Sequence, residues 1–261
     1  MQEQRERFPN AFQALLLVGL LFLLELIAWV AIDEAGAFTQ VSSMDLSAFI
    51  VVVGNGMLFI WLMAYKHINY RSLFHPSRNA VASTLLTVTV PTLMVVPGLV
   101  VLAGAANSVV VSLFPMSDAE DAFFADMMDE SFISILSGCV LAPVLEEMLF
   151  RGIILRSFLH QYSRTKAILL SSLVFAVAHL NLYQVATAVA IGIVAGWLYE
   201  RCRSLWPCIV LHAAYNAFVT LAYNGLLGAE ESTTTIGVAF VLAILGGLAL
   251  LRLLARAPAR R

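Results

Sequence analysis

Five polar side chains stand in segments that are otherwise apolar. They are Glu146, Glu147, His179, His212 and Asn216. An ionisable group in the hydrocarbon of a membrane costs about 2.5–3.5 kcal/mol on insertion scales. A chain therefore keeps such groups where they are paired, hydrated or used in chemistry, and these residues are the first candidates for a functional site.

Their chemical types suit hydrolysis at a carbonyl carbon. A carboxylate and an imidazole can together hold a water molecule and remove its proton. A second imidazole and an amide can donate hydrogen bonds to the oxyanion that forms when the water attacks. Zinc is an alternative, because Glu146, His179 and His212 would supply a known catalytic ligand set of two His and one Glu. The chain contains neither the zinc-protease motif His-Glu-x-x-His nor the serine-hydrolase motif Gly-x-Ser-x-Gly.

Local spacing separates the roles of the two adjacent glutamates. Successive residues of an α-helix point about 100° apart, so Glu146 and Glu147 face different surroundings. Glu147 and Arg151 lie on one face of the helix, and this spacing predicts an ion pair between them. Pro143 removes a backbone hydrogen bond and bends the helix just before the two glutamates. The carbonyl groups that the bend exposes fit best against a polar cavity.

Membrane-spanning helices must position these residues. The chain has 261 residues, of which 61% are hydrophobic and 12% charged, whereas soluble domains carry about 25% charged residues. Several apolar runs approach or exceed the roughly 18 residues of a spanning helix. These are residues 11–32, 47–65, 81–103 and 235–251. The net charge of −2 gives no basic field, so a nucleic-acid partner is not expected.

The basic residues predict how the helices cross the membrane. All 15 Lys and Arg residues fall into clusters that alternate with connections containing none, and such residues favour the cytoplasmic side. This pattern predicts an all-α, polytopic membrane bundle of about eight helices, with both termini in the cytoplasm. The predicted spans are residues 11–32, 47–65, 81–103, 131–159, 165–181, 184–200, 205–224 and 235–251. The whole chain, 1–261, is expected to form a single membrane domain, with its catalytic core at about 131–224.

Two connected segments follow the third predicted span. Residues 105–114 are still apolar, so they either extend that helix or lie along the outer membrane surface. Residues 115–130 are acidic and are expected to form an external loop. Pro91 and Pro97 should kink the third helix.

Other features are expected to be structural. Ala188, Gly192 and Gly196 recur at four-residue spacing, which lets another helix approach closely. The 3 cysteines form no disulfide framework and are expected to be buried thiols. Glu25 lies about 12 Å from the outer membrane face. It is expected to be protonated or bonded to a neighbouring helix, with a substrate contact as the alternative.

The candidate site residues lie at similar depths. Counted at 1.5 Å per residue from the nearest basic cluster, Glu146, His179, His212 and Asn216 lie about 14 to 20 Å into the membrane. They come from three different predicted helices, and nothing in the sequence forces their depths to agree. We therefore expect these side chains to meet in one layer of the bundle.

Three short motifs in this region resemble those of a known family. They are Glu146-Glu147-x-x-x-Arg151, Phe175-x-x-x-His179 and His212-x-x-x-Asn216. They resemble the motifs of the type II CAAX prenyl endopeptidases, also called the CPBP or Abi family, whose members are intramembrane proteases. Pro143 and Gly152 flank the first motif as they do in that family. The resemblance covers about residues 131–224.

The resemblance implies an eight-helix fold with an active site that opens toward the cytoplasm. By similarity, Glu146 and His179 activate water, and His212 with Asn216 forms the oxyanion site. Glu147 and Arg151 are implied to be structural. The favoured mechanism uses no metal, with zinc as the alternative. The implied partners are membrane lipid and a peptide or prenylated protein substrate, in a bacterial or archaeal cell membrane.

Other classes of function remain open from the sequence. Intramembrane Glu and His residues also form proton relays in transporters. A transporter would show inverted repeats with broken helices in both halves, whereas the polar residues here concentrate in the fourth, fifth and seventh predicted helices. A third class is a non-catalytic binding or bacteriocin-immunity protein on the same scaffold. The substrate is either a prenylated C-terminal tetrapeptide, a peptide signal or another membrane protein.

Overall fold

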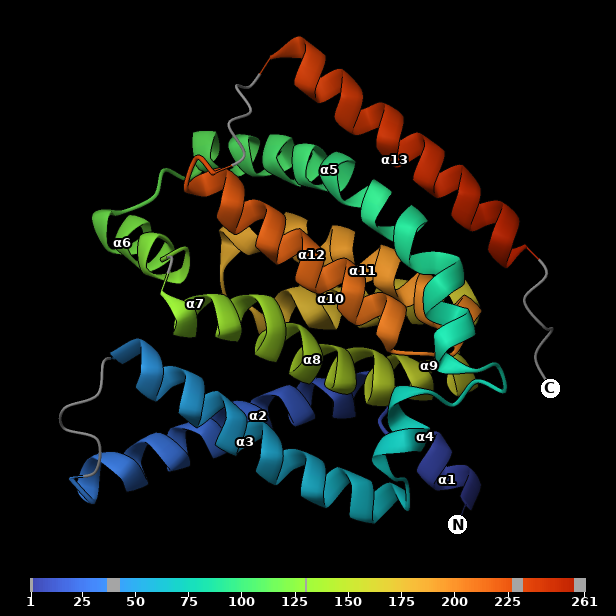
Figure 1. The fold of residues 1–261 in the computed structure, drawn as a ribbon. Helices are drawn as coiled ribbons and strands as arrows, with labels where there is room; N and C mark the ends of the chain where they lie inside the picture. Colours follow the sequence, from blue (N-terminus) through green and yellow to red (C-terminus); the bar gives the residue numbers. More distant parts are fainter. Residues whose placement is uncertain (1, 37–42, 130, 227–231, 256–261) are drawn as a thin grey trace.

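The computed structural model describes residues 2–36, 43–129, 131–226 and 232–255 (Figure 1). Every regular element in these ranges is helical, which confirms the all-α class. Helical stretches that are long and apolar enough to cross a membrane number 6 in the described residues. They are Ala11–Glu34, Asp45–Lys66, Val81–Leu113, Phe132–Gln161, Leu182–Cys202 and Thr233–Leu254. The chain is therefore an integral multi-pass membrane protein.

The long helices are α2 (Ala11–Glu34), α3 (Ser43–Lys66), α5 (Val81–Leu113), α10 (Arg164–Ala178), α11 (Leu182–Cys202), α12 (Trp206–Tyr223) and α13 (Thr233–Leu254). The predicted spans 165–181 and 205–224 appear as α10 and α12, and neither is among the six apolar stretches. With 15 residues, α10 is shorter than the roughly 17–25 of a spanning helix, and His212 and Asn216 interrupt the apolar sequence of α12. The predicted count of eight spans is not confirmed.

The segment from Phe132 to Gln161 is one continuous helical run with changing register. It consists of α7 (Phe132–Leu136), η1 (Ser137–Leu141), α8 (Ala142–Glu147), η2 (Met148–Leu155) and α9 (Arg156–Gln161). Both η1 and η2 are π-helical, a rare geometry that often marks functional sites. The sequence predicted an uninterrupted helix at 131–159 and contained no signal for the π-helical turns.

Two expectations for the region after the third span are settled by α5 and α6. Residues 105–113 extend α5, which contains both Pro91 and Pro97 and bends along its length in Figure 1. The acidic segment 115–130 is not simply a loop as predicted, because it contains the helix α6 (Asp118–Met127). The Ser117 side chain caps this helix while Glu120 bonds back to the Ser117 backbone, which is the capping-box pattern.

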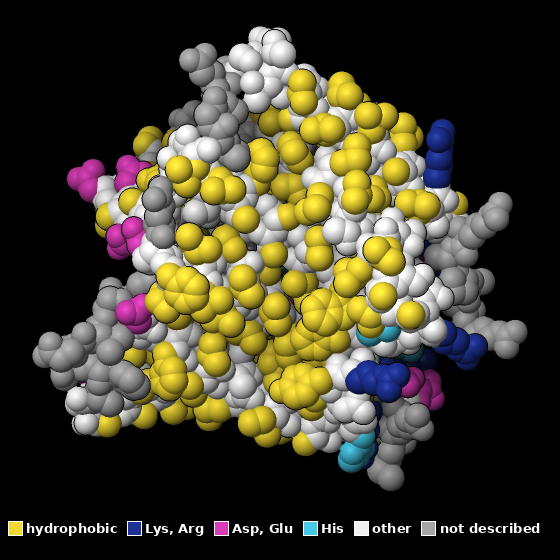
Figure 2. Space-filling view, viewed as in Figure 1, with side chains coloured by type: hydrophobic (Ala, Val, Ile, Leu, Met, Phe, Trp, Pro, Cys, Tyr) yellow, Lys and Arg dark blue, Asp and Glu magenta, His cyan; other side chains and the backbone are white. Residues whose placement is uncertain are grey.

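Charge divides the molecule into two ends with an apolar band between them. Figure 2 shows most of the visible acidic side chains at one end and the Lys, Arg and His side chains at the other, where an acidic side chain also lies. We call these the acidic end and the basic end. The short helices α1 (Gln2–Glu6) and α4 (Tyr70–Phe74) lie at the basic end with the C-terminal end of α13, and α6 lies at the acidic end (Figure 1).

The small residues of α11 pack closely against α10, as expected. A Cβ atom added at Gly192 would lie 2.7 Å from the Ser172 Cβ, and one at Gly196 would lie 3.1 Å from the Ile168 Cγ2. The three cysteines are free and buried, also as expected. These contacts fix α10 beside α11 and so determine where His179 lies at the end of α10.

Candidate active site

Glu147 and Arg151 form the predicted ion pair inside the protein. The Nη1 of Arg151 donates to Oε1 of Glu147 over 2.9 Å, and the two side chains are 1% and 0% exposed. The Arg151 guanidinium also lies over the Phe175 ring, 4.5 Å from its centre. Because both charges are buried, each depends on the other for compensation.

His212 connects this ion pair to the other glutamate. Its Nδ1 lies 3.0 Å from Glu147 Oε1, and its Nε2 lies 3.8 Å from Glu146 Oε2. A carboxylate that carries the Arg151 ion pair can only accept hydrogen bonds, so we assign the Nδ1 proton of His212 to the bond with Glu147. The Nε2 atom then faces Glu146. The adjacent glutamates therefore face opposite nitrogens of one imidazole, which the sequence analysis did not predict.

His179 presents one nitrogen for chemistry. Its Nδ1 lies 2.9 Å from the carbonyl oxygen of Phe175, and a carbonyl only accepts. Nδ1 therefore carries the proton, and Nε2 of the neutral ring keeps its lone pair. The ring is also held edge-on against Phe175, with 4.8 Å between ring centres. In the described part of the chain, no hydrogen bond or ion pair joins His179 directly to Glu146.

Asn216 is anchored by the backbone irregularity that Pro143 creates. In η1, the N–H of Ala142 bonds to the carbonyl of Ser137, five residues earlier. The next bond in that register would run from residue 143 to Gly138, but proline has no N–H. The Nδ2 of Asn216 donates to the Gly138 carbonyl over 2.7 Å instead. The expected exposed carbonyl is thus present and orients the amide of Asn216.

These groups share one cavity of about 870 Å³. Glu146, His179, His212 and Asn216 all line it, as expected from their similar depths. Glu147 and Arg151 lie behind its wall, within the core. The Glu146 side chain is 31% exposed, so its carboxylate can accept a bond from a molecule in the cavity, whereas its Oε2 atom is buried and faces His212.

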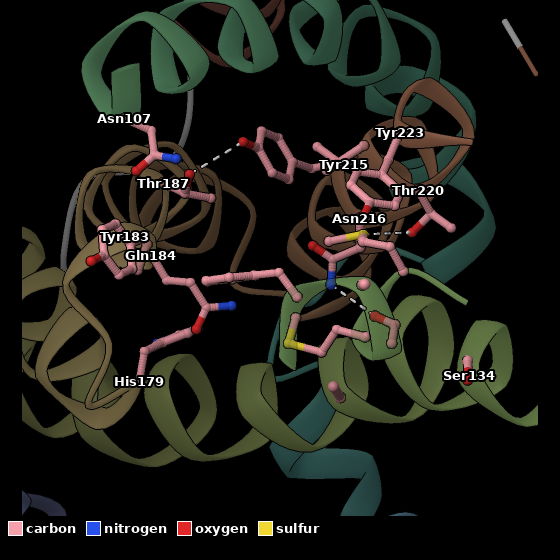
Figure 3. Close-up of a pocket in the computed structure, with 18 of the residues that line it drawn as sticks. Asn107, Ser134, His179, Tyr183, Gln184, Thr187, Tyr215, Asn216, Thr220 and Tyr223 are labelled. Atoms are coloured by element: carbon pink, nitrogen blue, oxygen red, sulfur yellow. Dashed lines mark hydrogen bonds between the residues drawn. The ribbon is translucent and has the colours of Figure 1, made fainter. Parts of the chain in front are cut away.

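Several polar side chains of the cavity were not singled out from the sequence. Figure 3 shows Gln184 and Thr187 of α11 facing Tyr215, Asn216 and Thr220 of α12 across the cavity. The Thr187 hydroxyl lies 3.4 Å from the Tyr215 hydroxyl and links the two helices. The available signal was the spacing on α12, because Asn216 and Thr220 continue the face of His212 at intervals of four residues.

Metal binding is the alternative role for Glu146, His179 and His212. Within the described ranges, no group of three or more His, Cys, Asp or Glu side chains is arranged so that it could hold a metal ion. No step below passes through a metal.

Glu25 is not among the residues that line the cavity. The Nδ2 of Asn55 on α3 donates to Glu25 Oε1 over 3.4 Å, so the acid is bonded to the neighbouring helix. A Cβ atom added at Gly54 would lie 2.5 Å from the Glu25 Cγ. Glu25 therefore helps to pack α2 against α3.

Comparisons with known proteins agree with the motifs. Residues 129–218 match the model of a family described as Rce1-like, type II CAAX prenyl endopeptidase. The Bacillus subtilis (strain 168) protein named "Putative membrane peptidase YdiL" is 29% identical over 96 residues. The matched part makes up 37% of this chain and 39% of that protein. No solved structure gives a significant match.

The matched segment contains all three motifs and most residues that line the cavity. The family resemblance read from the motifs is thereby confirmed by an independent comparison. It concerns this segment, whereas α2, α3, α5 and α13 lie outside it. Residues 129–218 of this integral membrane protein are therefore similar to the Rce1-like type II CAAX prenyl endopeptidases.

Proposed function

We propose that this protein is an intramembrane endopeptidase, related to the CAAX proteases, that hydrolyses a peptide bond of a membrane-embedded substrate. The observation that carries the proposal is the single cavity that contains Glu146, His179, His212 and Asn216, within the segment matched by the family model. The enzyme acts within the lipid of a bacterial or archaeal cell membrane and uses no metal.

In the proposed first step, Glu146 and His179 hold a water molecule between them. The His179 Nε2 lone pair and the Glu146 carboxylate both accept hydrogen bonds from water. As the water oxygen attacks the carbonyl carbon, one proton passes to this pair and a tetrahedral oxyanion forms. The C–N bond then breaks while the same proton is delivered to the leaving amine nitrogen.

His212 and Asn216 stabilise the oxyanion. Asn216 uses one amide hydrogen for the Gly138 carbonyl and has the second for the substrate. His212 donates from Nε2 when its ring carries both protons, because Nδ1 is committed to Glu147.

The test is proteolysis by purified protein in liposomes. Reporter peptides with and without a farnesyl group are compared, each with and without a zinc chelator. Glu146→Ala and His212→Ala should abolish cleavage, and the wild-type activity should survive chelation. Asp33→Ala and His160→Ala alter exposed residues outside the cavity and serve as matched controls.

Two results would contradict the proposal. Full cleavage by a folded Glu146→Ala variant would remove this carboxylate from the mechanism. Activity that is lost on chelation and restored by zinc would replace the metal-free mechanism by a metal-dependent one.

A further inference from the structure

The cavity occupies only one half of the membrane bundle. Apart from His212, which lies near the middle of α12, the lining residues of each helix come from the half nearer the acidic end. The helical run 132–161 contributes positions between 134 and 146, α11 between 183 and 191, and α12 between 212 and 223. The contribution of α5 is Asn107, six residues from its acidic end at Leu113.

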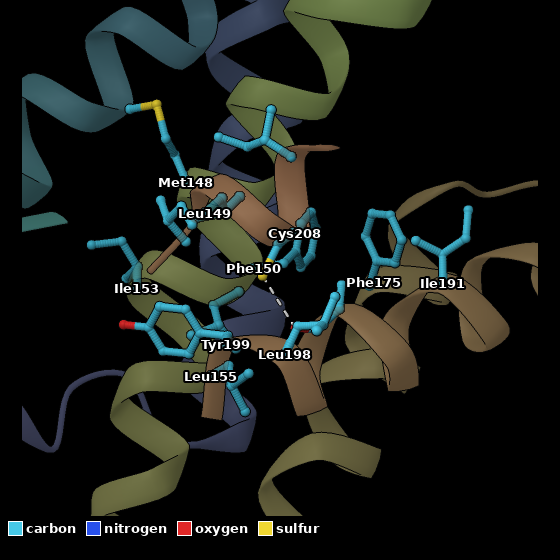
Figure 4. Close-up of a cluster of buried hydrophobic side chains, with 14 of the residues drawn as sticks. Met148, Leu149, Phe150, Ile153, Leu155, Phe175, Ile191, Leu198, Tyr199 and Cys208 are labelled. Atoms are coloured by element: carbon cyan, nitrogen blue, oxygen red, sulfur yellow. Dashed lines mark hydrogen bonds between the residues drawn. The ribbon is translucent and has the colours of Figure 1, made fainter. Parts of the chain in front are cut away.

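The other half of the bundle is closed by packed side chains. All 8 residues of η2 are buried, and they continue the helical run directly beyond Glu146 and Glu147. Figure 4 shows Leu149, Ile153 and Leu155 of η2 packed with Leu198, Tyr199 and Cys208. Each of these side chains is at most 1% exposed. The core therefore separates the candidate catalytic groups from the basic end.

The mouth of the cavity lies at the acidic end, beside α6. The lining residues that are exposed to solvent include Asp121, Ala122, Ala125 and Asp129 around this helix, and Tyr223 at the end of α12. No residue of α6 is buried, so the helix lies over the cavity without closing it into the core. A substrate that reaches Glu146 through this mouth comes from the acidic end.

The charge pattern identifies the side of the membrane that this end faces. Lys and Arg residues cluster at the basic end, where α3 and α11 end and α10 begins. Lys and Arg near helix ends favour the cytoplasm. The acidic end therefore faces away from it. This orientation conflicts with the family expectation of a site that opens toward the cytoplasm.

We propose that the peptide bond cleaved by this protein is presented from the non-cytoplasmic side of the membrane, through the mouth beside α6. The inference rests on the proposed peptidase function. The substrate class is then an exported or membrane-anchored polypeptide whose cleaved segment enters the cavity from the non-cytoplasmic side of the membrane. A cytoplasmic protein with a prenylated C-terminus would meet the closed end of the bundle.

The charge of the cavity supports the same substrate class. Among the described lining residues, Asp121, Asp129 and Glu146 are acidic and none is Lys or Arg. The free carboxylate of a CAAX-type substrate lies three residues beyond the cleaved bond, about 10 Å in an extended chain. At that distance it would still lie in or beside this acidic cavity, whose described lining has no Lys or Arg to pair with it. Neutral or cationic residues of an internal segment avoid this repulsion.

The first experiment determines which side of the membrane the mouth faces. Asp121→Cys places a thiol at the mouth, and His160→Cys places one at the exposed basic end. An impermeant maleimide applied to intact cells should label the Asp121→Cys variant and should label the His160→Cys variant only after permeabilisation. The native cysteines are buried, and the wild type measures their background. The reverse labelling pattern would overturn the proposal, whether or not the protein is a peptidase.

The second experiment connects the mouth to cleavage. A membrane-anchored reporter is displayed with its cleavable segment on the outer or the inner side. Only the outer reporter should be cut, and bulky labelling of Asp121→Cys should reduce cutting at least ten-fold. Glu34→Cys lies at the same end but outside the cavity lining, so labelling it should not reduce cutting. Preferential cutting of the inner reporter would overturn the proposal.

A third outcome distinguishes a failure of the proposed peptidase function from a failure of the proposed orientation of the cavity. If Asp121→Cys is labelled from outside but no reporter is cut, the peptidase function fails and the substrate class fails with it. The labelling result would still establish that the cavity opens away from the cytoplasm.

Discussion

Glu146 and Glu147 are neighbours in the sequence but belong to two different regions of the molecule. The Glu146 side chain is 31% exposed and borders the cavity, whereas Glu147 is 0% exposed and lies in the packed core. Their backbones are held by the same helix, so the difference comes from the surroundings. The cavity leaves an oxygen of Glu146 available, and the core fixes Glu147 between Arg151 and His212.

The two regions also use their π-helical turns differently. In η1, the irregular register and Pro143 leave a carbonyl that orients Asn216 at the cavity. In η2, the irregular turn is buried on all sides, and Gly152 allows Leu73 to approach, since an added Cβ would lie 2.6 Å from the Leu73 Cδ1. One π-helical segment therefore serves the cavity, and the other serves the packing that supports it.

The largest expected effect is the loss of cleavage activity when Glu146, rather than Glu147, loses its role as a proton acceptor. Glu146→Gln should reduce the cleavage rate by about 10²–10⁴-fold, because it removes a proton acceptor from the cavity. Its melting temperature in detergent should stay close to that of the wild type, because Glu146 has no hydrogen-bond partner at Oε2. A rate within a factor of two of the wild type would contradict the assigned role of this carboxylate.

The second expected effect distinguishes Glu147 from Glu146 by the loss of folding stability when the side chain is removed. Glu147→Ala should lower the free energy of unfolding by about 3–5 kcal/mol, because it leaves the buried Arg151 charge without compensation. Denaturation in mixed micelles would measure the loss. Arg164→Ala is the matched control. Arg164 forms an ion pair with Glu200, but its own side chain is 42% exposed, so this ion pair should contribute only about 0–1 kcal/mol to stability. Equal losses for the two variants would show that Glu147 is not held as a buried charge.

The third effect tests whether the Gly138 carbonyl orients a catalytic amide. Asn216→Ala should lower kcat by about 10²–10³-fold, the loss typical of one oxyanion donor. Asn224→Ala is the control, because Asn224 also donates to a carbonyl, that of Met128 over 2.8 Å, without lining the cavity. It should leave kcat nearly unchanged. Similar kcat losses in both variants would indicate a structural role for Asn216.

The sequence predicted the parts of this site that depend on local spacing. The Glu147–Arg151 pair follows from helical geometry, and the shared depth of Glu146, His179 and His212 follows from counting residues along three helices. The all-α membrane class follows from the apolar runs. These properties are local or additive along the chain, so they can be derived without knowing how the helices pack.

The parts that the sequence did not predict depend on contacts between helices. The bond between His212 and Glu147 joins positions 65 residues apart, and the end at which the cavity opens depends on how all the helices pack. The helix α6 is a different case, because Ser117 and Glu120 carry a capping-box pattern. Its acidic composition favoured the interpretation as a loop, although the local signal for a helix was present.

The smallest expected effect concerns α6, at the mouth of the cavity. The backbone N–H and hydroxyl of Ser117 donate to the Glu120 carboxylate and hold its pKa below the ordinary value of 4.5. A lowered pKa stabilises the start of the helix above pH 4.5, and this stabilisation is lost as the pH falls through the lower folded value. Glu120→Gln should therefore speed amide hydrogen exchange in the first turn of α6 at pH 7.

The pH dependence distinguishes this electrostatic effect from a general loosening of α6. The difference in exchange between the wild type and Glu120→Gln, after correction for intrinsic rates, should shrink below the folded pKa, because both side chains are then uncharged. Asp126→Asn, in the last turn of the same helix, should not speed exchange in the first turn. A difference that stays constant with pH would show that the Glu120 charge does not hold the start of α6. The buried helix η2 lies away from this cap, so its exchange should not change in either variant.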